Sequence, residues 1–189
     1  MKRFHTVFLF LVLLSSIRFA QNRNVAVVLK MGPSSYEFDG FNESSSWRSA
    51  LQTSAGVEFP ISSNFSLQTQ LYYSQHEVEA TGIYMNLVQK DPKIRLVDFL
   101  CSLKWNIGYF YLIGGYGLSL QNTDEMGVYV KGVYTKLDSK DNKIFKAYLL
   151  GMGADVNVWE NLNLIAEANL HIRDEYGGNL LMGVKYFIY

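Results

Sequence analysis

Cysteine, proline and net charge are all scarce in this chain of 189 residues. Its single cysteine, Cys101, excludes an internal disulfide, and we interpret it as a small apolar strand residue rather than a reactive thiol. The 17 Lys and Arg residues balance 17 Asp and Glu residues, so the sequence does not support a nucleic-acid interface. Only 3 residues are proline while 15% are aromatic, which favours β structure over helix.

After residue 20 there is also no hydrophobic run that looks like a membrane helix. The N-terminus has the layout of a secretory signal peptide: Lys2 and Arg3 precede an apolar run at 7–14, which is shorter than the roughly 20 residues of a spanning helix. We therefore predict a cleaved signal peptide at residues 1–20 and a single domain at residues 21–189. An exported chain without a membrane helix can still be a membrane protein if it folds as a barrel.

Alternation of apolar and polar residues is the main pattern that the sequence does contain. The segment 65–74 reads FSLQTQLYYS, with the apolar residues at the odd positions and mostly polar ones at the even positions. Successive side chains of a strand point to opposite faces, so this segment is predicted to be a strand with one apolar and one polar wall. The polar connection 62–64 makes it a hairpin with the run before it. Segment 56–67 aligns without gaps on 153–164, which suggests repeated hairpins.

Eight strand-like runs follow the signal segment, at 25–32, 49–61, 65–75, 94–105, 109–121, 144–158, 162–173 and 179–189. Their connections alternate between long (33–48, 76–93, 122–143) and short (62–64, 106–108, 159–161), and the brief 174–178 falls on the long side. This alternation predicts an all-β fold, an eight-stranded antiparallel up-and-down transmembrane β-barrel with short periplasmic turns and long outer loops.

One face of each strand-like run is free of charge, whereas the opposite faces carry Lys30, Glu58, Asp98, Lys104, Asp155, Glu167, Arg173 and Lys185. A charge facing lipid at the bilayer midplane costs about 2–4 kcal/mol, so we expect the uncharged faces to contact lipid. A soluble barrel or sandwich is the alternative, but its outside would be densely charged.

Side chains fill the interior of an eight-stranded barrel, and the buried charges must then pair. We predict pairs of Lys185 with Glu167 and of Lys30 with Glu58; a proton or ion path is the alternative.

Glycines gather on the interior side of two neighbouring strands, at Gly115, Gly117, Gly151 and Gly153. No helix follows the first two, which argues against a phosphate-binding loop. We predict that these glycines make room for long charged side chains from the opposite wall.

Two histidines follow the signal segment. His171 is predicted to face the interior beside Glu167, and His76 to begin the second long loop beside Ser74. We interpret both as hydrogen-bonded or exposed residues rather than catalytic groups or metal ligands, and we expect no cofactor. The enzymatic alternative is a lipid-modifying enzyme with a Ser/His/acid set at the outer rim.

The third long loop contains a tandem repeat, GVYVK at 127–131 followed by GVYTK at 132–136. A repeat of five residues turns the second copy to the other face of a strand unless Gly132 forms a bulge. We predict that the flanking strands continue beyond the bilayer as a raised ribbon. An exposed strand edge can add a strand from a partner. The possible partner-binding residues are Gly127, Tyr129, Lys131, Gly132, Tyr134 and Lys136, and a solvated loop is the alternative.

Over residues 21–189 this pattern resembles the small eight-stranded outer-membrane barrels, of the OmpX and OmpA membrane-domain kind and the PorT-like barrel domain. The resemblance implies an outer-membrane location and a last strand ending in an aromatic residue that the barrel-assembly machinery recognises. Phe187 and Tyr189 would supply that signal. Alternation counted back from Tyr189 would turn Lys185 toward lipid, so we favour the frame with Ile188 outward.

The resemblance also implies contacts with outer-membrane lipid and a non-enzymatic structural or surface-interaction role. The long outer loops would then meet an extracellular protein partner. An accessory membrane subunit of a protein secretion system is the alternative that the PorT-like resemblance implies. An outer-membrane lipid-modifying enzyme is the remaining one.

Overall fold

The computed structural model of the chain describes residues 25–38, 46–77, 93–123, 126–130, 133–138, 141–173 and 176–188. These residues form ten strands: β1 (Val25–Phe38), β2 (Ser46–Pro60), β3 (Phe65–Glu77), β4 (Lys93–Ile107), β5 (Phe110–Thr123), β6 (Met126–Val130), β7 (Val133–Asp138), β8 (Asp141–Trp159), β9 (Leu162–Ile172) and β10 (Tyr176–Ile188). Within these ranges, no helix has the length and apolar character needed to cross a membrane.

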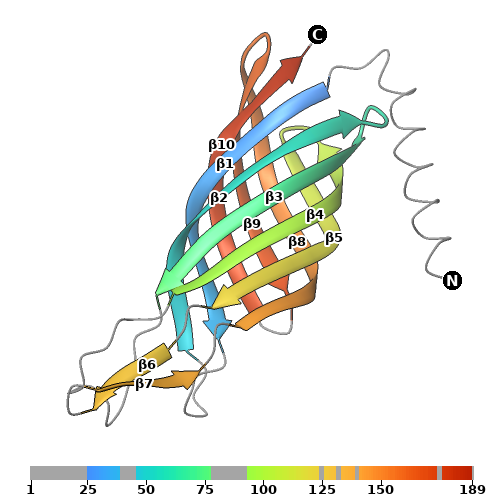
Figure 1. Cartoon of the computed structure of the whole chain (residues 1–189). Coiled ribbons are helices and arrows are strands. Elements are labelled where there is room, and N and C mark those ends of the chain that lie inside the picture. The colour runs from blue at the N-terminus through green and yellow to red at the C-terminus, as the bar shows by residue number, and fades with distance from the viewer. Residues whose placement is uncertain are drawn as a thin grey trace, which may run out of the picture.

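Eight of these strands close into an antiparallel barrel in the order β1-β10-β9-β8-β5-β4-β3-β2, as Figure 1 shows. The first and last strands complete the cylinder, with Val25 opposite Ile188 and Tyr36 opposite Gly177. Consecutive barrel strands are neighbours throughout, which is the up-and-down topology. The predicted eight-stranded barrel is therefore confirmed.

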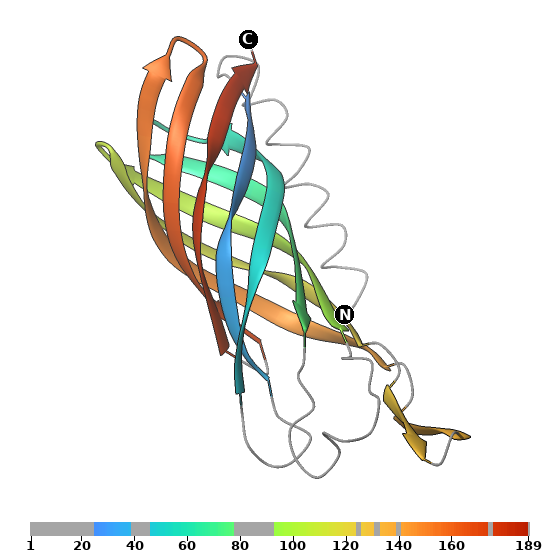
Figure 2. The ribbon, with the colours of Figure 1, turned by 90° about the vertical axis from the view of Figure 1, so that its left-hand side faces the viewer.

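The two ends of the barrel differ. Tight turns join β2 to β3, β4 to β5 and β8 to β9 at the short-turn end, and Gly108 takes a positive φ of 64° in the second of them. The hairpin β6–β7 lies beyond the opposite, long-loop end (Figure 2). The start of β1 and the end of β10 lie side by side at the short-turn end.

The stagger of the strands follows from the register. Starting at Phe110 and moving to the paired position on each next strand, one circuit of the barrel ends at Leu120, ten residues along β5, by way of Ala154, Ala166, Met182, Met31, Thr53, Tyr73 and Val97. A stagger of this kind inclines the strands by about 35–45° to the barrel axis. A row of residues that are paired across successive strands runs perpendicular to the strands. Such a row is therefore inclined to the barrel axis in the opposite direction from the strands.

The outer wall of the barrel is apolar over most of its height. Its outward positions carry exposed large side chains on every barrel strand, including Leu29, Leu51, Leu71, Phe99, Leu112, Met152, Leu164 and Leu180. An exposed apolar surface of this extent is not stable against water, so it faces hydrocarbon. Arg95 and Lys146 are the outward charges nearest the middle of β4 and β8, and they mark the long-loop edge of the apolar wall.

Several strands are longer than the sequence pattern predicts. The first strand was expected to stop at residue 32, yet β1 continues to Phe38 because Ser34, Ser35 and Tyr36 pair with both β10 and β2. Pro33, which lacks a backbone donor, and the two serines that follow are typical of a loop. Pairing on both sides of the strand overrides that local preference.

Candidate functional site

The barrel interior is the most highly organised polar region of the described chain, and it holds all eight charged residues that the sequence singled out. They come from six strands: Lys30 (β1), Glu58 (β2), Asp98 and Lys104 (β4), Asp155 (β8), Glu167 (β9) and Lys185 (β10), with Arg173 directly after β9. Each of the eight contacts at least one opposite charge. They form three groups at successive heights.

The short-turn cluster consists of Glu58, Lys104, Asp155 and Lys185. Lys104 Nζ lies 3.2 Å from Glu58 Oε2 and 3.0 Å from Asp155 Oδ2. Lys185 Nζ lies 3.5 Å from Glu58 Oε1 and also contacts Asp155 Oδ2. Each lysine therefore contacts both carboxylates, and each carboxylate contacts both lysines.

Neutral groups complete the hydrogen bonding of this cluster. Glu58 accepts hydrogen bonds from Ser66 Oγ at 2.9 Å and Gln68 Nε2 at 3.3 Å, while Asn163 Nδ2 donates to Asp155 Oδ1 at 2.5 Å. Buried carboxylates need such donors, because an ion pair alone does not offset the loss of hydration. Neutral protein groups thus donate to both carboxylates of the cluster.

The central pair is Lys30 and Glu167, whose side chains are 0% and 1% exposed and whose Nζ and Oε1 atoms lie 2.6 Å apart. Tyr111 donates to Glu167 Oε2 at 2.7 Å, and Asn169 Nδ2 donates to Oε1 at 2.8 Å. Lys30 also donates to Gln70 Oε1 at 3.1 Å. This pair has a single cation and a single anion, with neutral groups around it.

The predicted pairing of these charges is wrong in detail. Lys30 contacts Glu167 rather than Glu58, and Lys185 contacts Glu58 and Asp155 rather than Glu167. The reason is register: on β1, it is Ala26 and not Lys30 that stands opposite Glu58, and on β10 it is Leu181 and not Lys185 that stands opposite Glu167. Each of these two lysines crosses the neighbouring strand and contacts a carboxylate on the strand beyond it.

A glycine opens the path for the central pair. Gly183 of β10 stands opposite Lys30 and between it and β9, and a Cβ there would lie 2.7 Å from Lys30 Cγ. The stem of Lys30 therefore passes over β10 because that position has no side chain. Gly183 was not among the glycines that the sequence analysis singled out.

The four predicted glycines do line the interior, but different groups occupy the space they leave. A Cβ at Gly115 would meet Ser102, one at Gly151 would meet Asn169, and one at Gly153 would meet the ring of Tyr111. A Cβ at Gly117 would meet the backbone of β4. The neighbours are neutral groups of adjacent strands, so the expectation of charged chains from the opposite wall is wrong.

The long-loop cluster consists of Asp98, His171 and Arg173. Asp98 Oδ2 contacts Arg173 Nη2, and His171 Nδ1 lies 3.4 Å from the same oxygen. Asn179 Nδ2 lies 2.8 Å from His171 Nε2. Because the amide nitrogen can only donate, we assign Nε2 as the acceptor and the imidazole proton to Nδ1, which faces Asp98.

Amides and aromatic rings surround this cluster. Asn179 bonds to Gln52 at 2.6 Å, and Gln52 Nε2 donates to the Tyr36 hydroxyl at 3.1 Å. The Arg173 guanidinium lies 4.4 Å from the centre of the Tyr36 ring, and Tyr72 packs edge-on against His171. In the described part of the chain, rings and amides therefore pack around the ion pair at the long-loop end of the interior.

His76 lies within β3 rather than at the start of a loop, so that prediction is wrong. Its Nε2 is 3.0 Å from Ser74 Oγ, and both side chains are fully buried in the interior. A lipid on the outer wall has no access to this hydroxyl. In the described part of the chain, no group of three or more His, Cys, Asp and Glu side chains could hold a metal ion.

The tandem repeat forms its own antiparallel pair, β6–β7, in which Tyr129 stands opposite Tyr134 and Gly127 opposite Lys136. Lys131 and Gly132 lie outside the described residues, so the structure does not describe whether Gly132 forms a bulge. The irregularity that the structure describes falls between Met126 and Gly127. The two-stranded sheet is separate from the barrel sheet.

At the end of β10, the alternation follows the frame with Ile188 outward. Tyr186 and Ile188 are exposed on the wall, whereas Lys185 is buried and its Nζ lies 5.0 Å from the centre of the Phe187 ring. Tyr189 lies outside the described residues.

A closed antiparallel barrel with an apolar outside and paired charges inside defines the class of small membrane-spanning barrels. The chain belongs to the outer membrane protein beta-barrel domain family, whose model matches residues 6–186. Membership of this family implies a location in the outer membrane. A comparison with curated proteins finds no match.

Solved structures of the same fold include three small barrels. Ail, the attachment invasion locus protein of Yersinia pestis, is 14% identical with a TM-score of 0.58, and the match covers 87% of this chain and 98% of that one. OprG of Pseudomonas aeruginosa is 9% identical with a TM-score of 0.52, covering 87% and 96%. Neisserial surface protein A is 14% identical with a TM-score of 0.51, covering 87% and 97%. At these identities the likeness shows the fold alone.

The uncharged polar side chains of the interior network were not predicted from the sequence. Tyr36, Gln52, Tyr111, Asn169 and Asn179 are buried and bonded to one another or to the charges. Strand alternation places each of them on the inward face, so their position could have been predicted. Leu96, Leu100, Leu149 and Leu181 are also fully buried, which makes the interior more apolar than predicted.

Proposed function

We propose that this protein is an exported, non-enzymatic outer-membrane barrel that acts through its long-loop end. Residues 1–20 would direct export and be removed, and the short turns would face the periplasm. The observation that carries the proposal is the filled interior: the side chains of the central pair are 0% and 1% exposed, and every described charge of the interior network has an opposite charge beside it. A barrel filled in this way provides neither a channel nor an accessible reactive group.

The structured element at the long-loop end is the hairpin β6–β7. Among the described residues it pairs only with itself, so each strand has an outer edge that belongs to no larger sheet. Unpaired backbone donors and acceptors on such an edge can bond to an added strand. We therefore propose that the hairpin binds a protein partner, either outside the cell or within a secretion complex.

Replacing residues 126–138 by a short Gly-Ser linker tests this role. The barrel strands are untouched, so the variant should keep the compact gel migration of the folded wild type before boiling. Cross-linking in intact cells should then lose the partner band that the wild-type protein gives. A band of unchanged intensity would show that the hairpin is not the contact site.

Insertion is proposed to proceed through the barrel-assembly machinery, with Phe187 and Tyr189 as the recognised residues. Replacing both with serine should lower the amount of folded barrel in isolated outer membranes and leave precursor in the periplasm. The matched control is Tyr176→Ser at the other end of β10, which should insert normally. Equal insertion of all three proteins would argue against a C-terminal signal.

A further inference from the structure

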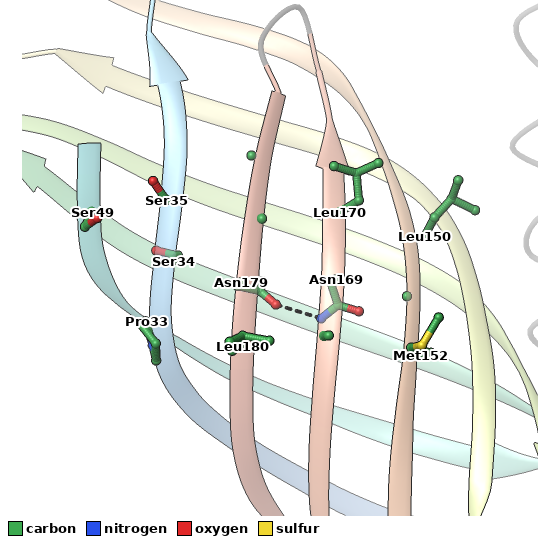
Figure 3. Close-up of a pocket in the computed structure, with 14 residues that line it drawn as sticks. Pro33, Ser34, Ser35, Ser49, Leu150, Met152, Asn169, Leu170, Asn179 and Leu180 are labelled. Carbon is green, nitrogen blue, oxygen red and sulfur yellow. Dashed lines mark hydrogen bonds between the residues drawn. The ribbon is translucent and has the colours of Figure 1, made fainter. Parts of the chain in front are cut away.

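The outer wall of the barrel is not uniformly filled. Two connected hollows lie over β8, β9, β10 and β1, with volumes of about 760 Å³ and 1010 Å³, and both are lined by Pro33, Met152, Ala168 and Leu180. Figure 3 shows the hollow nearer the long-loop end, with Leu150 and Leu170 along one side and Pro33 and Ser35 along the other. Together the hollows form one groove in the lipid-facing surface.

Small residues make the floor of this groove and large ones make its sides. In one row of paired residues, Ala168 stands between Met152 and Leu180, which are 62% and 63% exposed. In the row nearer the short-turn end, Ala154 and Ala166 are neighbours. The depth of the groove therefore comes from missing side-chain volume and not from a bend of the sheet.

The groove runs parallel to the barrel axis. From Ala166 the floor follows β9 to Ala168, then crosses diagonally to Gly178 on β10 and to Ser35 on β1. Strands and rows are inclined to the axis in opposite directions, so a path that alternates between them follows the axis itself. Strand and inter-strand spacings give the floor between Ala166 and Ser35 a length of roughly 15 Å, about half of the ~30 Å hydrocarbon core. That is the depth of one leaflet.

The two ends of the groove are chemically different. At the long-loop end it is lined by Ser35 and Ser49, which stand opposite each other on β1 and β2. At the other end its lining includes Phe110, which is 69% exposed. Hydroxyl groups at the membrane surface suit a polar headgroup, and an aromatic ring below Ala154 suits the end of a hydrocarbon chain.

We propose that this groove binds one acyl chain of a bilayer lipid, with the headgroup beside Ser35 and Ser49 and the chain lying over Gly178, Ala168 and Ala166. The surrounding wall is in contact with hydrocarbon, so the same phase supplies the occupant of the groove. An acyl chain that lies along the barrel axis is also parallel to the neighbouring lipid chains of the leaflet. An empty groove would lose the dispersion contacts of its lining.

The test is Ala168→Phe, which fills the floor where the two hollows meet, compared with the wild type. Both proteins are refolded into nanodiscs of palmitoyl-oleoyl phosphatidylethanolamine and released in a native mass spectrometer. The wild-type barrel should retain one lipid, and the retained fraction should fall by about tenfold or more in the variant. Ala166→Leu serves as a second variant if the first does not fold, as judged by gel migration before boiling.

The matched control is Cys101→Phe, an outward and exposed position on β4 that lies away from the groove. It adds the same ring to the wall and should retain one lipid as the wild type does. Equal retention by all the proteins would overturn the proposal, because bound lipid would then be independent of the groove. A wild-type dimer that Ala168→Phe converts to a monomer would also overturn it, in favour of a second copy of the chain.

Discussion

The two ends of the barrel interior neutralise their buried charges in different ways. At the short-turn end, two lysines and two carboxylates alternate, and each charge contacts both of its opposites. At the long-loop end, Asp98 contacts one guanidinium, and His171, amides and tyrosine rings fill the remaining space. The central pair resembles the long-loop end in having one cation for one anion.

The two ends differ in how many opposite charges each buried charge contacts. Removing one carboxylate from the short-turn cluster leaves the other carboxylate in contact with both lysines. Among the described residues, removing Glu167 or Asp98 leaves a buried cation beside neutral groups only. An uncompensated buried charge is far more destabilising than a weakened network. Substitutions that keep the shape and remove the charge should therefore rank by the number of partners left.

The largest expected effect is that of Glu167→Gln. Lys30 is then fully buried without a carboxylate, and the free energy of unfolding should fall by about 3–5 kcal/mol. Urea unfolding from phospholipid vesicles, followed by tryptophan fluorescence, measures it. The double variant Glu167→Gln with Lys30→Met removes both charges and should recover most of the loss. A single variant as stable as the wild type would show that the pair is not buried as described.

Asp98→Asn should have the second-largest effect, because Arg173 is 4% exposed and loses its carboxylate. Its place near the long-loop mouth lets water reach the guanidinium more easily than it reaches Lys30. We expect a loss of about 1.5–3 kcal/mol, the range of a hydrogen bond to a charged group. The same urea titration measures it. A loss larger than that of Glu167→Gln would reverse the proposed order.

Gly183→Ala should displace Lys30 from Glu167 without removing any charge. The added Cβ overlaps the backbone of β1 and lies 2.7 Å from Lys30 Cγ, so we expect a loss of about 1–3 kcal/mol. Gly114→Ala is the control, since its Cβ would meet only Leu150, at 3.8 Å. Equal unfolding midpoints for the two variants would contradict the role given to Gly183.

Glu58→Gln should have the smallest effect of the four, about 1 kcal/mol, because Lys104 and Lys185 both keep Asp155. Adding Asp155→Asn to it removes the last carboxylate of the cluster. The double variant should then lose more than the sum of the two single variants, as unfolding titrations of all three would show. Strict additivity would mean that the cluster is not redundant.

Much of the fold could be predicted from the sequence. Strand alternation separates the outer wall from the interior, and it placed Lys30, Glu58 and Glu167 on the inward side, where they lie. The frame with Ile188 outward could also be derived, because any other frame turns Lys185 toward lipid. These predictions use only the two-residue period of a strand and the instability of a charge in hydrocarbon.

The partners within the interior could not be predicted, because they depend on the stagger. Alternation gives each residue a face but not a height, so Lys30 was assigned to Glu58 on a neighbouring strand. The height follows from the register of all eight strands together. The extension of β1 past Pro33 and the position of His76 inside β3 have the same origin, since pairing with neighbouring strands decides them.

The central claim is that paired charges and packed side chains close the interior. The direct measurement is the ionic current through planar lipid bilayers that contain the refolded wild-type barrel, at neutral pH and with the same salt on both sides. The account predicts a baseline with no steady conductance steps under an applied voltage. Long-lived steps of uniform size from the purified protein would contradict it.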